Sequence, residues 1–132
     1  MKNNELITEL RFKALQSHQG SAFFKLGKRR GLAVSIVNSA VVISLDRSRT
    51  VCRDAKIALG AVGPRPVRAG SAERILIGQR VQEDMIEKAA LAAKEEVTPI
   101  DDIRGSAEYR REMVKVLAGR AIRKAIERAR NE

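Results

Sequence analysis

Residues 57–69, IALGAVGPRPVRA, separate two halves of the chain that differ in their hydrophobic pattern. Before this stretch, apolar residues tend to alternate with polar or small ones, and valine and isoleucine are frequent, which is typical of β-strands. After it, apolar residues recur every three or four positions, which is typical of helices. Pro64 and Pro66 cannot donate hydrogen bonds to a sheet, and the second disfavours helical angles at the residue before it. We therefore expect the last strand to end near Val62 and the first helix to begin no earlier than about Val67.

The two halves predict an α+β fold in which the strands come first. An alternating run at 6–13, with Leu6, Leu10 and Phe12 on one side, predicts a half-buried first strand, and 16–21 predicts a polar loop. Helices that follow strands, without βαβ alternation, indicate an antiparallel sheet of three to four strands with three helices packed on one face. The other strands are expected at 22–26, 34–45 and 51–62, and the helices at 68–77, 82–97 and after Ser106, a good N-cap residue.

The length of the chain favours a single domain, 1–132, with a sheet half at 5–62 and a helical half at 67–130. No run of 18 apolar residues is present, and the first residues lack the apolar stretch of a signal peptide, so we expect a cytoplasmic protein. The single cysteine, Cys52, excludes an internal disulfide, and its place in a predicted strand favours a packing role over catalysis. The single histidine, His18, leaves no histidine and cysteine cluster for a metal.

The excess positive charge belongs to the first part of the chain. The formal net charge is +10; residues 1–80 contain 15 Lys and Arg against 5 Asp and Glu, whereas residues 81–132 contain 11 of each. Such asymmetry suggests an anionic partner, such as nucleic acid, a phosphorylated cofactor or an acidic protein surface. Phe23 and Phe24 could stack on bases, but a strand here should bury at least one ring. A basic surface that binds no ligand explains the charge equally well.

Two clusters of charged residues are candidates for chemistry. Asp101 and Asp102 could form a carboxylate pair for acid–base work or Mg²⁺, but no histidine accompanies them. A structural role is favoured, in which these acids pair with nearby arginines such as Arg104, Arg110 and Arg111. The better candidate is the segment 25–31, KLGKRRG, which places four cations in six residues and is interrupted by glycines. It could reach an anion or the carbonyl oxygens of a cofactor, or it could be a solvated hairpin.

Three stretches together resemble one family, the C-terminal domain of the FAD-binding subunit of molybdenum hydroxylases such as xanthine dehydrogenase and aerobic carbon monoxide dehydrogenase. The junction, IALGAVGPRPVRAGSAE at 57–73, resembles the family segment ALGGVAPTPVRAxxAE. The connector PIDDIRGSAEYRR at 99–111 is similar to PxxDxRGSAxYRR, and FKLGKRR at 24–30 is similar to YxKLxxRR. The likeness runs from about Glu5 to Ala129, and the order and spacing of the three stretches make it specific.

The resemblance implies a small sheet with three helices and a role beside a flavin. In such enzymes, electrons from a substrate oxidised at a molybdopterin centre pass through iron–sulfur clusters to FAD and then to an acceptor. By resemblance, Lys25 lies beside the isoalloxazine, and the loop with Lys28, Arg29 and Arg30 lies near it. The family often has Asp or Tyr near the flavin at position 33, where this chain has Ala33.

These observations lead to one main hypothesis and two alternatives. The main hypothesis is a module that is not catalytic alone and helps to enclose FAD held mostly by a glycine-rich lobe that this sequence lacks. Its implied partners are that FAD-binding lobe and the iron–sulfur and molybdopterin subunits of the same complex. The alternatives are a basic module that binds nucleic acid, which the shortage of aromatic residues disfavours, and an assembly domain without a ligand.

Overall fold

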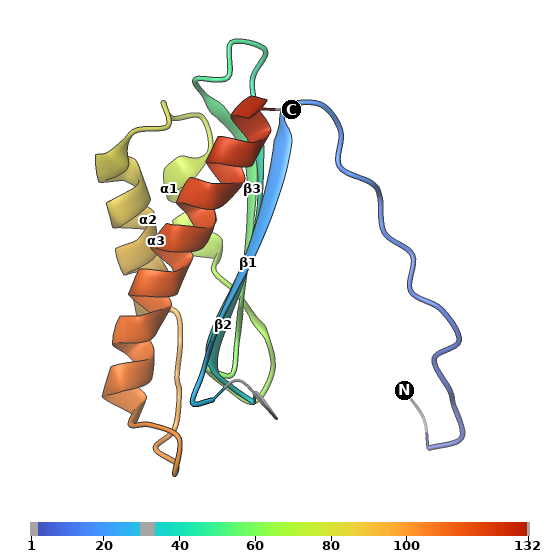
Figure 1. Cartoon of the computed structure of the whole chain (residues 1–132), viewed down its shortest axis with the longest axis vertical. Coiled ribbons are helices and arrows are strands. Elements are labelled where there is room, and N and C mark those ends of the chain that lie inside the picture. Colours follow the sequence, from blue (N-terminus) through green and yellow to red (C-terminus); the bar gives the residue numbers. More distant parts are fainter. Residues whose placement is uncertain (1–2, 30–33, 132) are drawn as a thin grey trace.

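The computed structural model describes residues 3–29 and 34–131, and within them it contains one four-stranded sheet and three helices. All neighbouring strands are antiparallel, and their order in the sheet follows their order in the sequence. The helices lie on one face of the sheet, so the expected α+β fold is confirmed (Figure 1). The strands are β1 (Gln19–Gly27), β2 (Ser35–Leu45), β3 (Cys52–Gly60) and β4 (Val67–Arg68), and the helices are α1 (Gly70–Leu76), α2 (Glu83–Glu95) and α3 (Ala107–Asn131).

Strand β2 is central, and its alternating burial defines the two faces of the sheet. Every second residue from Val37 to Leu45 is buried in the core that the sheet shares with the helices. The residues between them are only half-buried because no helix covers their side. We call this side the open face. Its described residues from the three long strands include Phe23, Lys25, Asn38, Ala40, Val42, Lys56 and Ala58.

The helices pack through small residues. Ile86, Ala89, Ala90 and Ala93 form the buried side of α2. At the crossing with α3, a Cβ placed on Gly119 would be 3.6 Å from that of Ala90. Alanine and glycine therefore let the two helices approach closely.

The ends of the helices also agree with the sequence. The hydroxyl of Ser106 accepts a hydrogen bond from the backbone N–H of Tyr109 at 3.1 Å, which confirms the expected N-cap of α3. Gly78 has a φ of +80° directly after the C-cap of α1, an angle that favours glycine.

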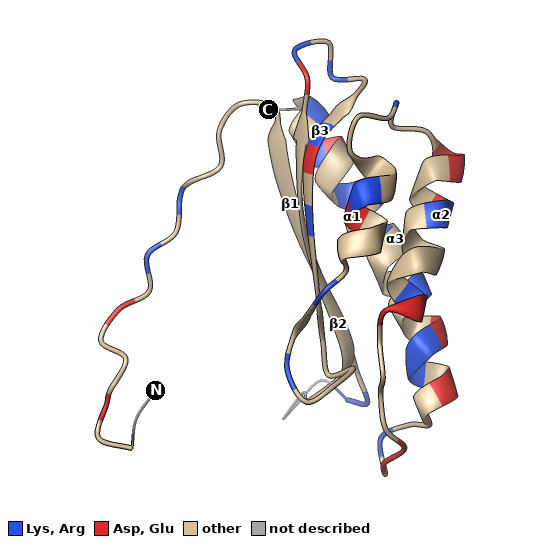
Figure 2. Ribbon diagram, turned by 180° about the vertical axis from the view of Figure 1, so that it is seen from behind, with Lys and Arg blue, Asp and Glu red and all other residues tan. Residues whose placement is uncertain are grey.

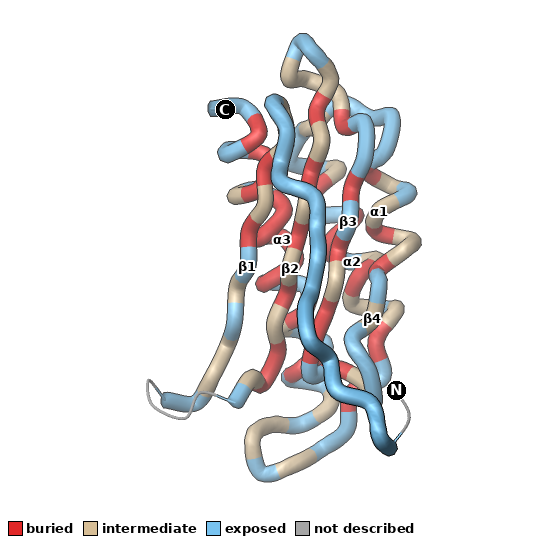
Figure 3. The backbone as a smooth tube through the Cα atoms, turned by 90° about the vertical axis from the view of Figure 1, so that its right-hand side faces the viewer, coloured by how far each residue is buried: buried red, intermediate tan, exposed pale blue. Residues whose placement is uncertain are grey.

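The predicted first strand is wrong. Residues 5–16 form neither strand nor helix, and Leu6, Leu10 and Phe12 are 87%, 82% and 91% exposed. Figure 3 shows this exposed segment crossing in front of the sheet on the side away from the helices. Alternation of apolar and polar residues indicates that a segment prefers an extended backbone. It does not show that a neighbouring strand is present to form hydrogen bonds with that segment.

Strand β1 begins earlier than the sequence indicated, inside the predicted polar loop. Gln19 pairs with Ser44 at the end of β2, and its side-chain amide donates to the Ser44 hydroxyl at 2.9 Å. Gly20 is buried because it lies directly against the backbone of α3. A polar sequence therefore forms part of the sheet through contacts distant in the chain.

The junction contains a short strand that the sequence did not reveal. Val67 and Arg68 pair with Leu59 and Ala58, which makes β4 the edge of the sheet. Helix α1 accordingly begins two residues later than predicted, at Gly70. Pro66 precedes β4, in keeping with the preference of proline for strand ends and sheet edges.

Cys52 is a packing residue, as expected. It is 1% exposed, and burial raises the pKa of its thiol to about 11. The thiol therefore stays protonated near neutral pH, and its Sγ lies 3.5 Å from the carbonyl oxygen of Asp54. None of the helices in the described residues has the length and apolar character needed to cross a bilayer.

Candidate functional site

The three stretches that carry the family resemblance meet at one end of the sheet. This end, which we call the tip, contains the end of β1, the start of β2, the turn after β3 and the connector that leads into α3 (lower end of Figure 1). Antiparallel pairing brings the first three together, since Gly27 pairs with Ser35 and Asn38 pairs with Gly60. Figure 2 shows cations of the loops and acids of the connector at this same end.

Arg110 holds the tip together. The residue is 3% exposed, and its Nη1 donates to the carbonyl oxygens of Ile36 at 2.7 Å and Ala61 at 3.0 Å. Its Nη2 donates to Oδ1 of Asp102 at 2.5 Å. One guanidinium therefore links β2, the turn after β3 and the connector, which uses the fixed fork of donors that arginine offers.

Asp102 has a structural role, which confirms the favoured prediction for the acidic pair. The backbone N–H of Arg104 donates to Oδ1 at 2.7 Å, and the side chain of Arg104 donates to Oδ2 at 2.9 Å. These bonds and the Arg110 guanidinium lower the pKa of Asp102 to about 2, the backbone bond contributing most. Asp101 caps α3 instead, since its Oδ1 accepts from the backbone N–H of Ala107 at 2.6 Å. Asp102 is therefore ionised at neutral pH and is not placed as a proton donor.

The turn after β3 contains a strained residue. Ala61 has a φ of +63°, in the left-handed region that favours glycine, and the family segment ALGGVAP has glycine at this position. We expect Ala61→Gly to stabilise the protein by about 1 kcal/mol, because a left-handed angle costs a residue with a Cβ about that much. Urea unfolding measures the change.

The matched control for this prediction is Ala58→Gly in strand β3. It is the same substitution at a position with ordinary strand geometry, and it should destabilise by about 0.5–1 kcal/mol. If both variants lose stability equally, the left-handed angle of Ala61 is not a source of strain.

The basic loop lies over the connector. Lys28 donates from its Nζ to the backbone carbonyl of Ile103, so this cation is bonded within the chain. Arg29 is exposed beside it. Arg30 and Ala33, which the resemblance placed near a flavin, lie outside the described residues. A hollow of about 280 Å³ lies between Lys28 and Arg29 of the loop and Ile103 and Arg104 of the connector.

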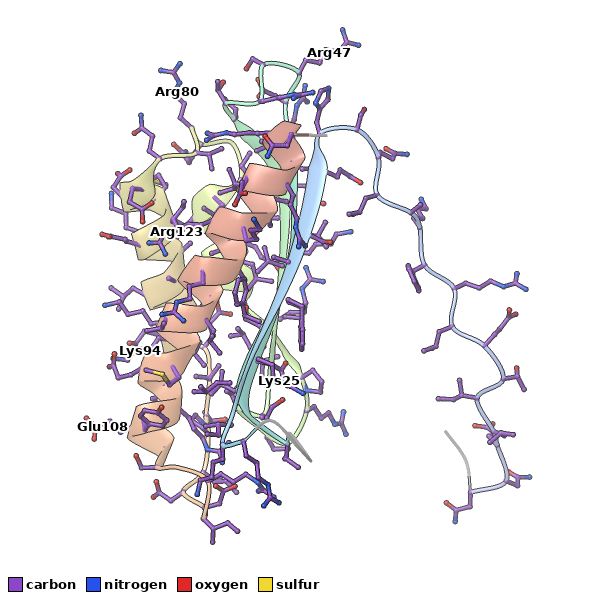
Figure 4. The ribbon with its side chains drawn as sticks, viewed as in Figure 1. Lys25, Arg47, Arg80, Lys94, Glu108 and Arg123 are labelled. Carbon is purple, nitrogen blue, oxygen red and sulfur yellow. The ribbon has the colours of Figure 1, made fainter. Side chains whose placement is uncertain are left out.

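Lys25 belongs to a polar row across the open face. It pairs with Asn38 of β2, and Asn38 pairs with Gly60 of β3, so the three lie side by side. A Cβ on Gly60 would be 2.4 Å from Oδ1 and 2.8 Å from Nδ2 of Asn38. The side-chain amide of Asn38 therefore packs directly against the backbone of Gly60, in the space that a side chain would fill. Figure 4 places Lys25 in the half of the sheet near the tip. Lys25 was named as a candidate from the sequence, whereas Asn38 and Gly60 were not, because their position beside Lys25 depends on strand register.

Beyond this row the open face is mostly apolar. Phe23, Ala40 and Ala58 lie side by side across the three long strands, and Phe23 is 61% exposed. Phe24 points the other way and packs against the core, as expected for one ring of the pair. The two rings therefore cannot both stack on bases, which removes one of the two sequence arguments for nucleic acid and leaves the basic charge as the other.

This architecture defines a class of small α+β domain with helices on one sheet face and a basic tip beside the open face. The chain belongs to the CO dehydrogenase flavoprotein C-terminal domain family, whose model matches residues 22–125.

Known proteins agree with this assignment in sequence and in structure. The chain is 32% identical to the carbon monoxide dehydrogenase medium chain of Afipia carboxidovorans over 127 residues, which cover 96% of this chain and 43% of the relative. It is 28% identical to the nicotinate dehydrogenase FAD-subunit of Eubacterium barkeri, over 86% of this chain and 38% of the relative.

A solved carbon monoxide dehydrogenase from Hydrogenophaga pseudoflava superposes with a TM-score of 0.82 at 30% identity, over 87% of this chain and 39% of the solved chain. The chain thus spans about two-fifths of the length of the relatives that it matches.

Proposed function

We propose that this chain is the C-terminal module of a molybdenum hydroxylase FAD subunit and that its open face, at the tip end, covers the flavin. The observation that carries the proposal is the pair of Lys25 and Asn38 beside Gly60, which presents an ammonium and an amide on an open sheet face in a member of a flavoprotein family. The module would complete a site whose larger part belongs to an FAD-binding lobe.

The chemistry of the row fits the ring of FAD. An isoalloxazine is a flat apolar surface with carbonyl and N–H groups along one edge. The apolar patch at Phe23, Ala40 and Ala58 suits the ring surface, whereas the ammonium of Lys25 and the amide of Asn38 suit the edge of the ring. Bound FAD would supply the electron-transfer chemistry, and Lys25 would favour electron-rich forms of the ring by placing a positive charge beside it.

Partners follow from the same proposal. The names of the relatives describe medium chains and an FAD-subunit, so we infer that this module works within a larger complex. In that complex an FAD-binding lobe holds the cofactor, and iron–sulfur and molybdopterin subunits deliver electrons from the oxidised substrate. The basic charge of the tip would assist contact with an anionic cofactor or an acidic surface.

The test is a complex between this chain and an FAD-loaded lobe, prepared from the Eubacterium barkeri FAD-subunit by removing the portion that this chain matches. Adding the chain should quench flavin fluorescence and slow FAD dissociation. We expect Lys25→Ala to weaken FAD retention about tenfold, which corresponds to the loss of one charge-assisted hydrogen bond. Flavin fluorescence and dialysis measure both effects.

Lys56→Ala is the matched control. Lys56 lies on the same open face as Lys25 but farther from the tip, opposite Val42. Its removal should leave FAD retention unchanged. Equal effects of the two variants, or an unaltered flavin signal when the chain is added, would overturn the proposed role of the tip.

A further inference from the structure

The segment before β1 exposes more apolar side chain than any other described part of the chain. Leu6, Leu10 and Phe12 are each more than four-fifths exposed, and Ile7 is 63% exposed. Residues 5–16 are extended, and among the described residues none of them joins the sheet. Figure 1 shows this segment leaving the start of β1 and running beside the open face, away from the helices.

The sequence of this segment has the pattern of a half-buried strand, although the segment does not pair with the sheet described above. Leu6, Leu10 and Phe12 fall on one side of an extended chain, and Glu9 and Arg11 fall on the other. Extended backbone with unpaired N–H and C=O groups is a ready edge for pairing with another sheet. A surface that takes this segment must therefore offer a strand edge and an apolar layer beneath it.

The similarity to longer relatives indicates which protein domain offers that surface. The family model begins at residue 22, after the segment, yet the match to the Hydrogenophaga pseudoflava carbon monoxide dehydrogenase medium chain covers 129 residues and thus includes it. The matched part is only 42% of that relative. The segment is thus shared with relatives, lies outside the C-terminal domain and adjoins the part of them that this chain does not match.

We infer that residues 6–13 form a β-strand of the FAD-binding lobe, added to an edge of that lobe's sheet with Leu6, Leu10 and Phe12 turned into its core. This inference rests on the proposed function, since it names the contact that joins the module to its lobe. The open face lies on the same side as the segment, and Phe12 lines a hollow with Phe23 and Val42 of that face. A lobe seated between them would cover both apolar surfaces at once.

The experiment compares the full chain with the triple variant Leu6→Ser/Leu10→Ser/Phe12→Ser, using a lobe prepared in the same way from the Hydrogenophaga pseudoflava medium chain, whose removed portion includes the counterpart of residues 6–13. The triple variant should bind the lobe at least about 100-fold more weakly, because three apolar side chains no longer enter its core. Its own unfolding midpoint should match that of the parent chain, since the three side chains are exposed there. The control, Glu9→Gln/Arg11→Gln/Lys13→Gln, changes the other side of the strand and should bind within about threefold of the parent.

Hydrogen exchange provides the direct readout. The amides of residues 6–13 should exchange at the rate of an open chain in the free protein and become protected in the complex. Unchanged exchange in a complex that still alters flavin fluorescence would overturn the strand inference and leave the proposed function intact. Failure of the parent chain to bind the lobe would overturn both. Protection that grows with the concentration of the chain alone, together with dimers in light scattering, would assign the strand to a second copy and overturn the inference.

Discussion

Gly20→Ala is expected to destabilise the protein by about 3 kcal/mol, because there is no room for a side chain between β1 and α3. A Cβ at this position would be 2.1 Å from the carbonyl oxygen of Ala125 and 2.4 Å from the backbone nitrogen of Ala129. Both are backbone atoms of a helix, so relief requires α3 to move away from the sheet. Urea unfolding with a fitted slope measures the loss and tests whether the transition stays two-state.

Gly63→Ala is the matched control for Gly20. A Cβ on Gly63 would be 3.7 Å from its nearest neighbours, which is ordinary van der Waals contact, so its stability should change by less than about 0.5 kcal/mol. Arg128 supports the same contact between β1 and α3, since its Nη1 donates to the carbonyl oxygen of Ser21 at 2.6 Å. A Gly20→Ala variant as stable as the parent would show that β1 and α3 do not approach this closely.

The parts of the fold that the sequence predicted are those whose signals are local. β2 and β3 follow from long apolar runs, α2 follows from its alanine stripe, and the cap of α3 follows from Ser106. The first strand failed because alternation at 6–13 shows a preference for extended backbone without showing which sheet accepts it. β4 was missed because a strand of two residues has no periodicity to detect.

The candidate site divides in the same way. Lys25 and the basic loop were found from a short motif, and Lys28 proved to be bonded to the connector. Asn38 was not named, because it becomes a candidate only through its position between Lys25 and Gly60 across three strands. This register is set by the pairing of all three strands, so the sequence around Asn38 does not predict which residues will lie beside it.

In the acidic connector, the partners that lie nearby in the sequence could be predicted, whereas the distant ones could not. Sequence analysis named three arginines as partners for the acids, and the structure selects Arg104 and Arg110 for Asp102. The carbonyl groups of Ile36 and Ala61 are 74 and 49 residues away from Arg110, so no local pattern could have named them. The same long-range bonds make Arg110 the second position at which a single substitution should have a large effect.

We expect Arg110→Met to destabilise the protein by about 3 kcal/mol. Methionine fills a similar space but takes the guanidinium donor away from the carbonyl oxygens of Ile36 and Ala61. It also removes one of the three hydrogen bonds that the carboxylate of Asp102 accepts. Arg111→Met is the matched control, since Arg111 is the exposed neighbour on the same helix and should change stability by less than about 0.5 kcal/mol. Denaturant unfolding of both variants measures the difference.

Arg110→Lys separates charge from geometry at the same position. Lysine keeps the positive charge but cannot place separate donors on Ile36, Ala61 and Asp102 with a planar fork, so we expect it to recover less than half of the stability that Arg110→Met loses. Full recovery would mean that a buried positive charge beside Asp102 suffices and that the three-way link is incidental. Partial recovery would show that the tip, and with it the end of the open face where Lys25 lies, is held in place by the shape of one guanidinium.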